Sequence, residues 1–271
     1  MLILMAAILG IVEGLTEFLP ISSTGHLILV SKLMGIDTLK GIESFEIGIQ
    51  SGAILAVILL YRKKLLGLLL GCIKRDSKSI KTILTVGIAF LPAVVMGVLF
   101  GSEIKAVLFH PVYVVAALFV GGVAMVVLER KLVIKHGKNK IAEKADVENY
   151  RQALSIGLFQ CLALWPGTSR SMATILGARL LGIQAKAAAE FSFLLAIPTL
   201  LGACAYDVLK HRHELMNSEM PLMGWIVGFV TAFFSAWLVI KWFINYLSKN
   251  SLESFGWYRI LVAVAYCIAN V

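Results

Sequence analysis

Two carboxylates lie four residues apart near the start of the chain, inside an otherwise apolar segment. Glu13 and Glu17 belong to the stretch EGLTEFLPISSTGH, residues 13–26, which continues through a proline into hydroxyl groups and an imidazole. Residues four apart share one face of a helix, so these carboxylates are close enough to bind one metal ion or to affect each other's protonation. The spacing therefore makes Glu13 and Glu17 candidate metal ligands or acid–base groups.

Hydroxyl side chains follow the proline at position 20. Because proline ends the helix before it, these residues lie where the N-cap of the next helix belongs, just before the stretch GHLILVSKL. This first hydroxyl cluster consists of Ser22, Ser23 and Thr24. His26 follows closely and is suited to act as a base, an acid or a nucleophile at neutral pH.

A second polar motif, PGTSRS, occupies residues 166–171. Its TSRS part precedes the stretch MATILGARL, as the first hydroxyl cluster precedes its own helix. Two helix N-termini would then present amide hydrogens and positive dipole ends, which favour an anion. Arg170 adds a planar charge suited to bidentate contact with phosphate. Together with the carboxylates and the imidazole, this set fits phosphoryl transfer with a divalent metal.

The elements that carry these residues are expected to be membrane helices. Hydrophobic residues make up 59% of the 271-residue chain and the mean hydropathy is +0.87, which exceeds what a soluble globular surface allows. Charge-free runs at 82–102 and 220–240 are long enough to cross a hydrocarbon core as helices. We therefore expect an all-α integral membrane protein.

The basic residues behind the net charge of +9 crowd into two segments between spans, 62–81 and 129–151. Such crowding is typical of cytoplasmic loops. Two predicted spans separate these loops, which returns the chain to the same side and makes both assignments agree. The charge therefore indicates membrane topology, and the sequence gives no support for nucleic-acid binding.

The chain repeats part of its own pattern. GIVEGLTEFLPISS at 10–23 and GLFQCLALWPGTSRS at 157–171 both place a glycine, a Glu or Gln, a proline and a hydroxyl cluster in the same order. This similarity predicts two halves of a single membrane domain, about 1–128 and 150–271, joined by the basic cytoplasmic loop 129–151.

Each copy of the motif is expected to lie in a re-entrant helical hairpin, at 1–35 and at 152–182. Proline-broken backbone at membrane depth is tolerated only where protein or a water-filled cavity surrounds it. Three full spans in each half are an odd number of crossings, which inverts the second half relative to the first. The predicted fold is an inverted-topology repeat of six transmembrane helices and two re-entrant hairpins. The six predicted spans are 45–61, 82–102, 106–128, 187–209, 220–244 and 256–271.

At its motifs the chain resembles the bacterial undecaprenyl-diphosphate phosphatase family, also called bacitracin-resistance protein. The family's first motif is matched by EGLTEFLPISSTGH, and its second, PGxSRSxxT, by PGTSRSMAT at 166–174. The similarity also runs through FEIGIQSGAILAV, FQCLALWPG and EFSFLLAIP, so it covers nearly the whole chain.

The resemblance implies that the chain removes the terminal phosphate of undecaprenyl diphosphate in the bacterial cell (inner) membrane. On the same basis, the product is the monophosphate carrier lipid for peptidoglycan and other envelope polymers, and an abundant enzyme gives tolerance of bacitracin. Dependence on Mg2+ or Ca2+ and a site that opens toward the outer, periplasmic face are also implied. A homodimer is a possible assembly.

By this resemblance, Glu13 and Glu17 become metal or acid–base groups, and Ser23 and His26 become nucleophile and base, with the division between them open. Attack on the terminal phosphorus comes either from Ser23 or from water activated through His26 or Glu17. The catalytic set is Glu17, Ser23, His26 and Arg170. The residues assigned to phosphate binding are Ser22, Thr24, Ser169, Arg170, Ser171 and Thr174.

Two other classes of protein share parts of this pattern. Inverted repeats with broken helices are transporter architecture, so a polyprenyl-phosphate flippase or an anion transporter is the alternative function. Phosphate release in detergent separates the two, because transport needs two compartments. Another lipid phosphatase superfamily has a Pro-Ser-Gly-His motif and a further His six residues after an arginine. Here the sixth residue after Arg170 is Leu176, which excludes that superfamily.

Overall fold

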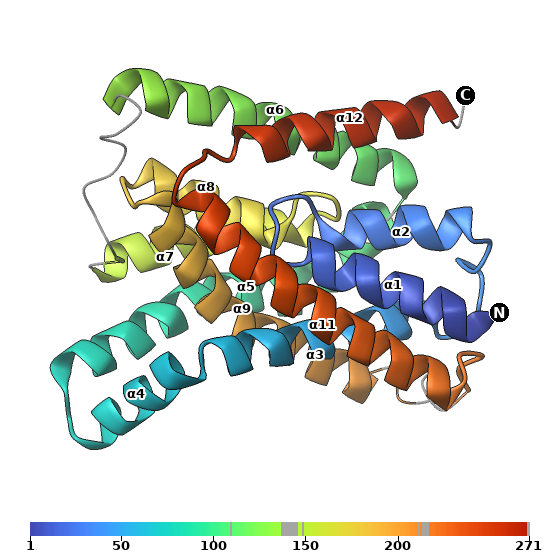
Figure 1. The fold of residues 1–271 in the computed structure, drawn as a ribbon, viewed down its shortest axis with the longest axis horizontal. Coiled ribbons are helices and arrows are strands. Elements are labelled where there is room, and N and C mark those ends of the chain that lie inside the picture. The colour runs from blue at the N-terminus through green and yellow to red at the C-terminus, as the bar shows by residue number, and fades with distance from the viewer. Residues whose placement is uncertain (109, 137–145, 148, 211, 213–216, 270–271) are drawn as a thin grey trace.

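The structure, a computed structural model, describes residues 1–108, 110–136, 146–147, 149–210, 212 and 217–269. Every regular element in these ranges is a helix, so the predicted all-α class is confirmed there (Figure 1). In chain order the elements are α1 (Leu2–Thr16), α2 (Ser23–Leu33), α3 (Ile42–Leu60), α4 (Arg62–Ile73), α5 (Ser77–Leu108), α6 (Pro111–His136), α7 (Tyr150–Cys161), η1 (Leu162–Leu164), α8 (Arg170–Leu180), α9 (Ala185–Lys210), α11 (Leu222–Leu247) and α12 (Glu253–Ala269).

Five of the described helices are long and apolar enough to cross a membrane. They are α3, α5, α6, α9 and α11, and they coincide with five of the six predicted spans. The sixth predicted span, 256–271, falls on α12, which has 17 residues and is shorter than the other five. The chain is therefore a multi-pass helical membrane protein.

The segment 62–81 was predicted as a loop, and this is wrong because it contains the helix α4. Its sequence RKKLLGLLLGCI is rich in leucine, which favours helix, and has no proline. α4 packs mainly against α5 and buries none of its residues, so Leu66, Leu69, Leu70 and Ile73 are exposed. An apolar face beside basic residues suits a helix that lies at a membrane surface.

The ends of the two basic segments also differ from the prediction. The first basic segment, 62–81, ends inside α5, which begins at Ser77. Just before this helix, Asp76 accepts hydrogen bonds from the amide and the hydroxyl of Ser79 at 2.9 and 2.6 Å. These bonds lower the pKa of the exposed Asp76 carboxyl.

The second basic segment was predicted as a loop over 129–151. α6 continues to His136 and α7 begins at Tyr150, so helix occupies both ends of this predicted loop. The middle of that loop falls on residues 137–145 and 148, outside the described part.

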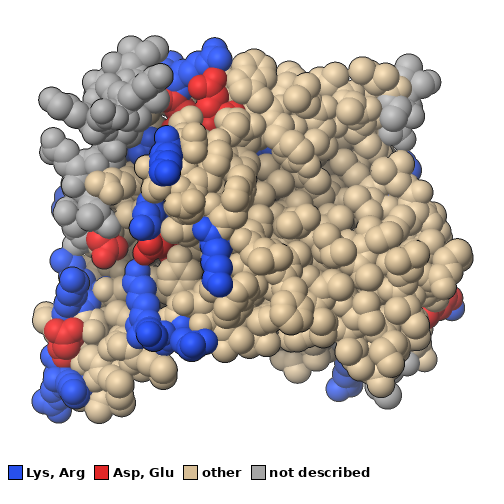
Figure 2. Space-filling view, viewed as in Figure 1, with Lys and Arg blue, Asp and Glu red and all other residues tan. Residues whose placement is uncertain are grey.

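Lys and Arg gather at one end of the molecule. Figure 2 shows them at the end where α4 lies in Figure 1, while the middle of the visible face lacks Lys, Arg, Asp and Glu. Charged side chains are rare within a bilayer because transferring them out of water is costly. An uncharged belt beside a charged end therefore fits a protein embedded in a membrane.

α1 and α2 form one helical hairpin, and α7, η1 and α8 form another, at the positions predicted from the sequence. In Figure 1 the first hairpin comes from the end that holds the N terminus, and the second comes from the opposite end. Their tips are the turns with the first residue of the helix that follows, residues 17–23 and 165–170, and these tips lie near the middle. α1 packs against α11 and α7 against α5, so each hairpin contacts a span of the other predicted half. α3 also packs against α9, and α6 against α12.

Close backbone contacts repeat in the two hairpins. Gly10 of α1 lies against α11, where a Cβ atom would come 2.3 Å from the carbonyl oxygen of Gly228. Gly157, which the sequence repeat aligns with Gly10, lies against α5, where a Cβ atom would come 2.5 Å from the carbonyl oxygen of Ala89. Both positions need glycine for the same physical reason, which is the close approach of a second helix.

Candidate active site

The two hairpin tips have the same backbone geometry at the residue before their second helix. Ser22 and Ser169 have φ of 74° and 75°, a region that residues other than glycine rarely adopt. Each hydroxyl accepts a hydrogen bond of 3.2 Å from the amide three residues later, that of Gly25 or Met172. The prediction that the hydroxyl clusters cap α2 and α8 is therefore confirmed.

Side chains join the two tips directly. The guanidinium of Arg170 donates to one carboxylate oxygen of Glu17 at 3.2 Å, and the other oxygen accepts from the Ser23 hydroxyl at 2.5 Å. All three side chains are buried. Ser171 adds a further link, because its hydroxyl donates to the Leu19 carbonyl at 2.6 Å. The structure thus brings Arg170 to a carboxylate 153 positions away in the sequence.

A cavity of about 240 Å³ lies between the tips. Six of the predicted site residues line it: Glu17, Ser22, Ser23, Thr24, Ser169 and Arg170. Gln50, Gln160 and Thr199 add neutral polar groups to the wall, and the sequence analysis did not assign them to the site. The Nε atom of Arg170 is buried and has no hydrogen-bond partner among the described residues. Arg170 lines the cavity, and its Nε–H is a donor that no described group uses.

Four predicted site residues do not line this cavity, namely Glu13, His26, Ser171 and Thr174. The Thr174 hydroxyl lies 2.7 Å from the Ser192 hydroxyl, and the Ser192 carbonyl accepts from Arg170 at 3.0 Å. Ser171 lies 3.0 Å from the Ser169 hydroxyl. Ser171 and Thr174 therefore hold residues of the second tip through hydrogen bonds without lining the cavity.

His26 is held on the side of α12. Its Nδ1 atom lies 2.7 Å from the Ser22 carbonyl, which can only accept, so Nδ1 donates the proton. Its Nε2 atom lies 2.9 Å from the hydroxyl of Tyr258, whose ring stacks on the imidazole with centroids 5.6 Å apart. Both ring nitrogens are therefore engaged, and the hydrogen-bond partner of Ser23 is Glu17 instead of His26.

Glu13 is fully buried, and neither of its carboxylate oxygens has a hydrogen-bond partner among the described residues. It interacts electrostatically with the carboxylates Glu17 and Glu46 and with the guanidinium of Arg170. A buried carboxylate without a partner is costly unless it gains a proton or a cation, and oxygen is the ligand that Mg2+ and Ca2+ prefer. The described residues hold no group of three or more His, Cys, Asp or Glu arranged around one ion. The two Glu13 oxygens would therefore accept a proton or a cation, although Glu13 does not line the cavity and a cation would need ligands beyond the described residues.

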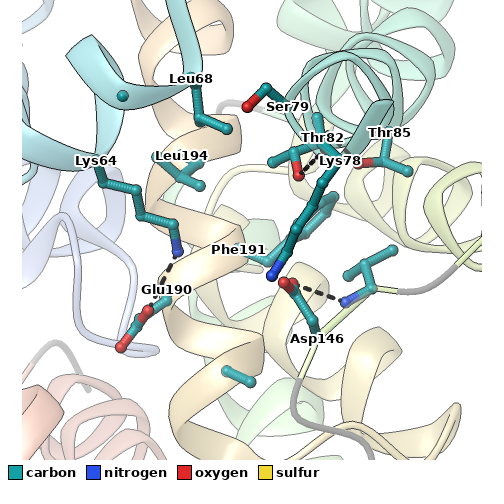
Figure 3. Close-up of a pocket in the computed structure, with 13 residues that line it drawn as sticks. Lys64, Leu68, Lys78, Ser79, Thr82, Thr85, Asp146, Glu190, Phe191 and Leu194 are labelled. Atoms are coloured by element: carbon teal, nitrogen blue, oxygen red, sulfur yellow. Dashed lines mark hydrogen bonds and ion pairs between the residues drawn. The ribbon is translucent and has the colours of Figure 1, made fainter. Parts of the chain in front are cut away.

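A second cavity, of about 410 Å³, lies at the basic end of the molecule (Figure 3). Lys64 reaches Glu190 at 3.4 Å, and Figure 3 shows Lys78 extended toward Asp146. Its two cations face two anions, and it contains none of the predicted site residues. The candidate active site is therefore the smaller cavity between the tips.

Tyr258 and Arg259 of α12 contact the tips, and the sequence analysis did not single them out. Arg259 is fully buried. One signal was available, because Arg259 is a lone basic residue in the apolar stretch RILVAVAYCIA, and a charge within a predicted span is by default a functional candidate.

Comparison with known proteins supports the resemblance seen in the motifs. The family model described as "Bacitracin resistance protein BacA" matches residues 6–265. The chain is 49% identical over 266 residues to "Undecaprenyl-diphosphatase" of Albidiferax ferrireducens, covering 97% of this chain and 93% of the relative. It is 47% identical over 263 residues to the protein of the same name from Polaromonas naphthalenivorans, with the same two coverages. "Undecaprenyl-diphosphatase 3" of Acinetobacter baylyi is 46% identical over 259 residues, with coverages of 96% and 94%.

The chain therefore belongs to the bacitracin resistance protein BacA family, and the family predicted from the sequence motifs is confirmed.

Proposed function

We propose that this chain is a membrane phosphatase that hydrolyses undecaprenyl diphosphate to undecaprenyl phosphate and inorganic phosphate. The observation that carries the proposal is the buried link from Arg170 through Glu17 to Ser23, in a cavity between two capped helix starts. Relatives across nearly the whole chain bear the name of this activity. The reaction regenerates the lipid carrier used for peptidoglycan synthesis, and an abundant enzyme gives resistance to bacitracin.

In this proposal Ser23 is the nucleophile and Glu17 is its base. The Ser23 hydroxyl already donates to Glu17, so Glu17 is placed to take the proton as the oxygen forms a bond to the terminal phosphorus. The bond from that phosphorus to the bridging oxygen breaks, and undecaprenyl phosphate leaves. Glu17 passes its proton to the departing undecaprenyl phosphate and is a carboxylate again. Water then attacks the phosphorus of the phosphoserine while Glu17 accepts a proton from that water. The bond from phosphorus to the Ser23 oxygen breaks, Glu17 returns the proton to that oxygen, and inorganic phosphate is released.

Arg170 neutralises the phosphoryl oxygens in this scheme. One of its nitrogens holds Glu17 while the buried Nε atom has no partner, so a single guanidinium can align the base and contact the phosphate. The starts of α2 and α8 add the positive ends of two helix dipoles. Such fixed charges are most effective where water is excluded.

A divalent cation, Mg2+ or Ca2+, completes the proposed site. Glu13 would hold it, because its two buried oxygens have no hydrogen-bond partner among the residues that the structure describes, and Glu17 lies one helical turn away. When bound, the ion would neutralise negative charge on the diphosphate. Phosphate oxygens and water would supply the remaining ligands, as is usual for Mg2+.

The same proposal includes the inverted-topology repeat with re-entrant hairpins and a site open to the outer face. Its support is the reciprocal packing of α1 on α11 and α7 on α5, and the repeated glycine contacts. A third cavity of about 520 Å³ shares Thr24, Ile47, Gln50 and Ala203 with the site. It extends along the end of α9 near Lys210, away from the basic end, which supports a route from the site toward the side opposite the basic segments.

Phosphate release by the purified chain in detergent tests this function against a flippase or transporter, which would need two compartments. Wild-type protein should release phosphate from undecaprenyl diphosphate, and Arg170→Ala should not. Arg130→Ala is the matched control, because Arg130 forms an exposed pair with Glu253 far from the cavity. Turnover near the wild-type rate in Arg170→Ala would contradict the proposed site. All of these residues come from one chain, so the test does not depend on a homodimer.

A further inference from the structure

Arg259 is a fully buried cation whose hydrogen bonds all go to main-chain carbonyl oxygens. Nε donates to Leu118 at 3.3 Å, Nη1 to Pro20 at 3.3 Å and Thr168 at 2.9 Å, and Nη2 to Ala117 at 3.0 Å and Gly167 at 2.8 Å. A guanidinium has five N–H donors, so these five bonds use its full capacity.

The five carbonyls belong to three separate parts of the fold. Pro20 is in the first tip, Gly167 and Thr168 are in the second, and Ala117 and Leu118 are in α6. Backbone in the tips is irregular, and its carbonyls need partners because a bilayer supplies none. One side chain thus satisfies both tips at once and fixes them to the same helix.

The neighbouring helix is shaped for this side chain. A Cβ atom at Gly121 of α6 would lie 2.3 Å from Nη2 and 2.9 Å from Cζ of Arg259. Glycine at position 121 is therefore needed for the guanidinium to reach the tips. Ala117 and Leu118, whose carbonyls bind Arg259, lie one helical turn before Gly121.

Arg259 does not line the cavity, but its partners lie next to residues that do. Gly167 itself is in the cavity wall, Thr168 is followed by Ser169, and Pro20 lies two positions before Ser22. The bond to Thr168 also sets the direction of the peptide that leads into Ser169, because C=O and N–H point to opposite sides of a trans peptide.

We propose that Arg259 is a positioning residue for the hydrolysis of the lipid diphosphate. It fixes the first tip, which carries Ser23 and Glu17, in register with the second tip, which carries Arg170. It does so without touching the substrate. This inference rests on the proposed function, and it concerns alignment instead of binding. Its loss should therefore lower kcat much more than it changes KM.

Two substitutions disturb the register in different ways. Arg259→Lys keeps a positive charge but cannot make five bonds in one plane, and Gly121→Ala leaves Arg259 in place but displaces its guanidinium. A shift of about 1 Å in a catalytic group can cost about a hundredfold. We expect kcat to fall about ten- to a hundredfold in both variants, with KM within about threefold of wild type. Gly87→Ala is the matched control, because a Cβ there meets no atom within 4 Å.

The measurements are kcat and KM for phosphate release in detergent, normalised to folded protein by size-exclusion chromatography, and hydrogen exchange of peptides that span the tips. Faster exchange at both tips in Arg259→Lys and Gly121→Ala, absent in Gly87→Ala, is the expected result. Wild-type kcat in both variants, a rise in KM alone, or a loss that disappears after normalisation would overturn the positioning role. Absence of phosphate release by the wild type would instead refute the proposed function.

Discussion

The first hairpin tip carries Glu13 and Glu17 on its leading helix, whereas the aligned positions of the second hairpin hold Gln160 and Leu164. The second tip instead carries Arg170 at the start of its trailing helix. Yet the residue before the second helix has the same geometry in both tips, since Ser22 and Ser169 have nearly equal φ and the same capping bond.

This difference shows how a repeated scaffold supports an asymmetric reaction. Two tips with carboxylates would repel a diphosphate, and two tips with arginines would lack a base. One acidic and one basic tip supply both, and Arg170 pairs with Glu17 where the tips meet. In the proposed site, the cap geometry that the two tips share positions the helix starts, and the residues that differ between the tips are the ones to which the chemistry is assigned.

Removing the proposed nucleophile should have the largest effect. Ser23→Ala deletes the hydroxyl that bonds Glu17 in the first tip, so phosphate release should fall by at least about a thousandfold. Ser171→Ala, just after the second tip, removes a hydroxyl that does not line the cavity but bonds the Leu19 carbonyl, so the loss should be much smaller, about tenfold or less. The check is initial rate of phosphate release at saturating lipid. Equal losses in the two variants would show that the tips do not differ as proposed.

A second buried ion pair, between Arg179 of α8 and Glu129 of α6, allows an effect on protein stability to be distinguished from an effect on catalysis. Arg179 bonds Glu129 at 3.0 Å, with side chains 3% and 0% exposed. Glu129→Gln leaves Arg179 without a charged partner, so the free energy of unfolding should drop by about 3–5 kcal/mol. Thermal unfolding in detergent measures this change. The remaining folded protein should keep a near-normal kcat, in contrast to Arg170→Ala, and a selective loss of kcat would count against the distinction.

The metal assignment depends on Glu13 differing from its aligned residue Gln160. Glu13→Gln makes the first tip resemble the second at this position and removes the charge that would bind a cation. The Mg2+ concentration for half-maximal activity should rise about ten- to a hundredfold. Titration of chelator-treated protein with Mg2+ and Ca2+ measures it. An unchanged metal requirement would remove Glu13 from the site.

The smallest effect tests what the tips share. Ser22→Ala and Ser169→Ala each remove one N-cap, so each should lower the free energy of unfolding by about 1 kcal/mol. Because the two caps have the same geometry, the two shifts in thermal midpoint should be nearly equal. A large shift in only one variant would show that the two caps contribute unequally to the stability of the protein.

Much of the fold followed from local pattern. Long apolar runs predicted five spans in the right places, and the proline with its hydroxyl cluster predicted the breaks at both tips and the caps on α2 and α8. α4 was not predicted because its first three residues are basic, and the segment was therefore interpreted as a cytoplasmic loop. The leucine-rich sequence that follows these basic residues forms the helix. Charge reports which side of a membrane a segment faces, and it carries little information on whether the segment is helical.

The site was predictable to the level of its motifs. Glu17, Ser23 and Arg170 were selected as polar residues in apolar surroundings, and the structure brings them into direct contact. His26 has the right chemistry for a base, but its orientation depends on Tyr258, 232 positions later. No local pattern could indicate that contact.

The sequence by itself determined that this chain is a helical membrane protein with two proline-broken hairpins and the motifs of its family, because hydropathy, helix caps and helix breaks are local properties. Only the tertiary structure decided which carboxylate Arg170 meets, that Glu13 has no hydrogen-bond partner in the described part of the chain, and that Arg259 joins both tips. Those outcomes depend on how helices from distant parts of the chain pack, and packing is set by all their side chains together.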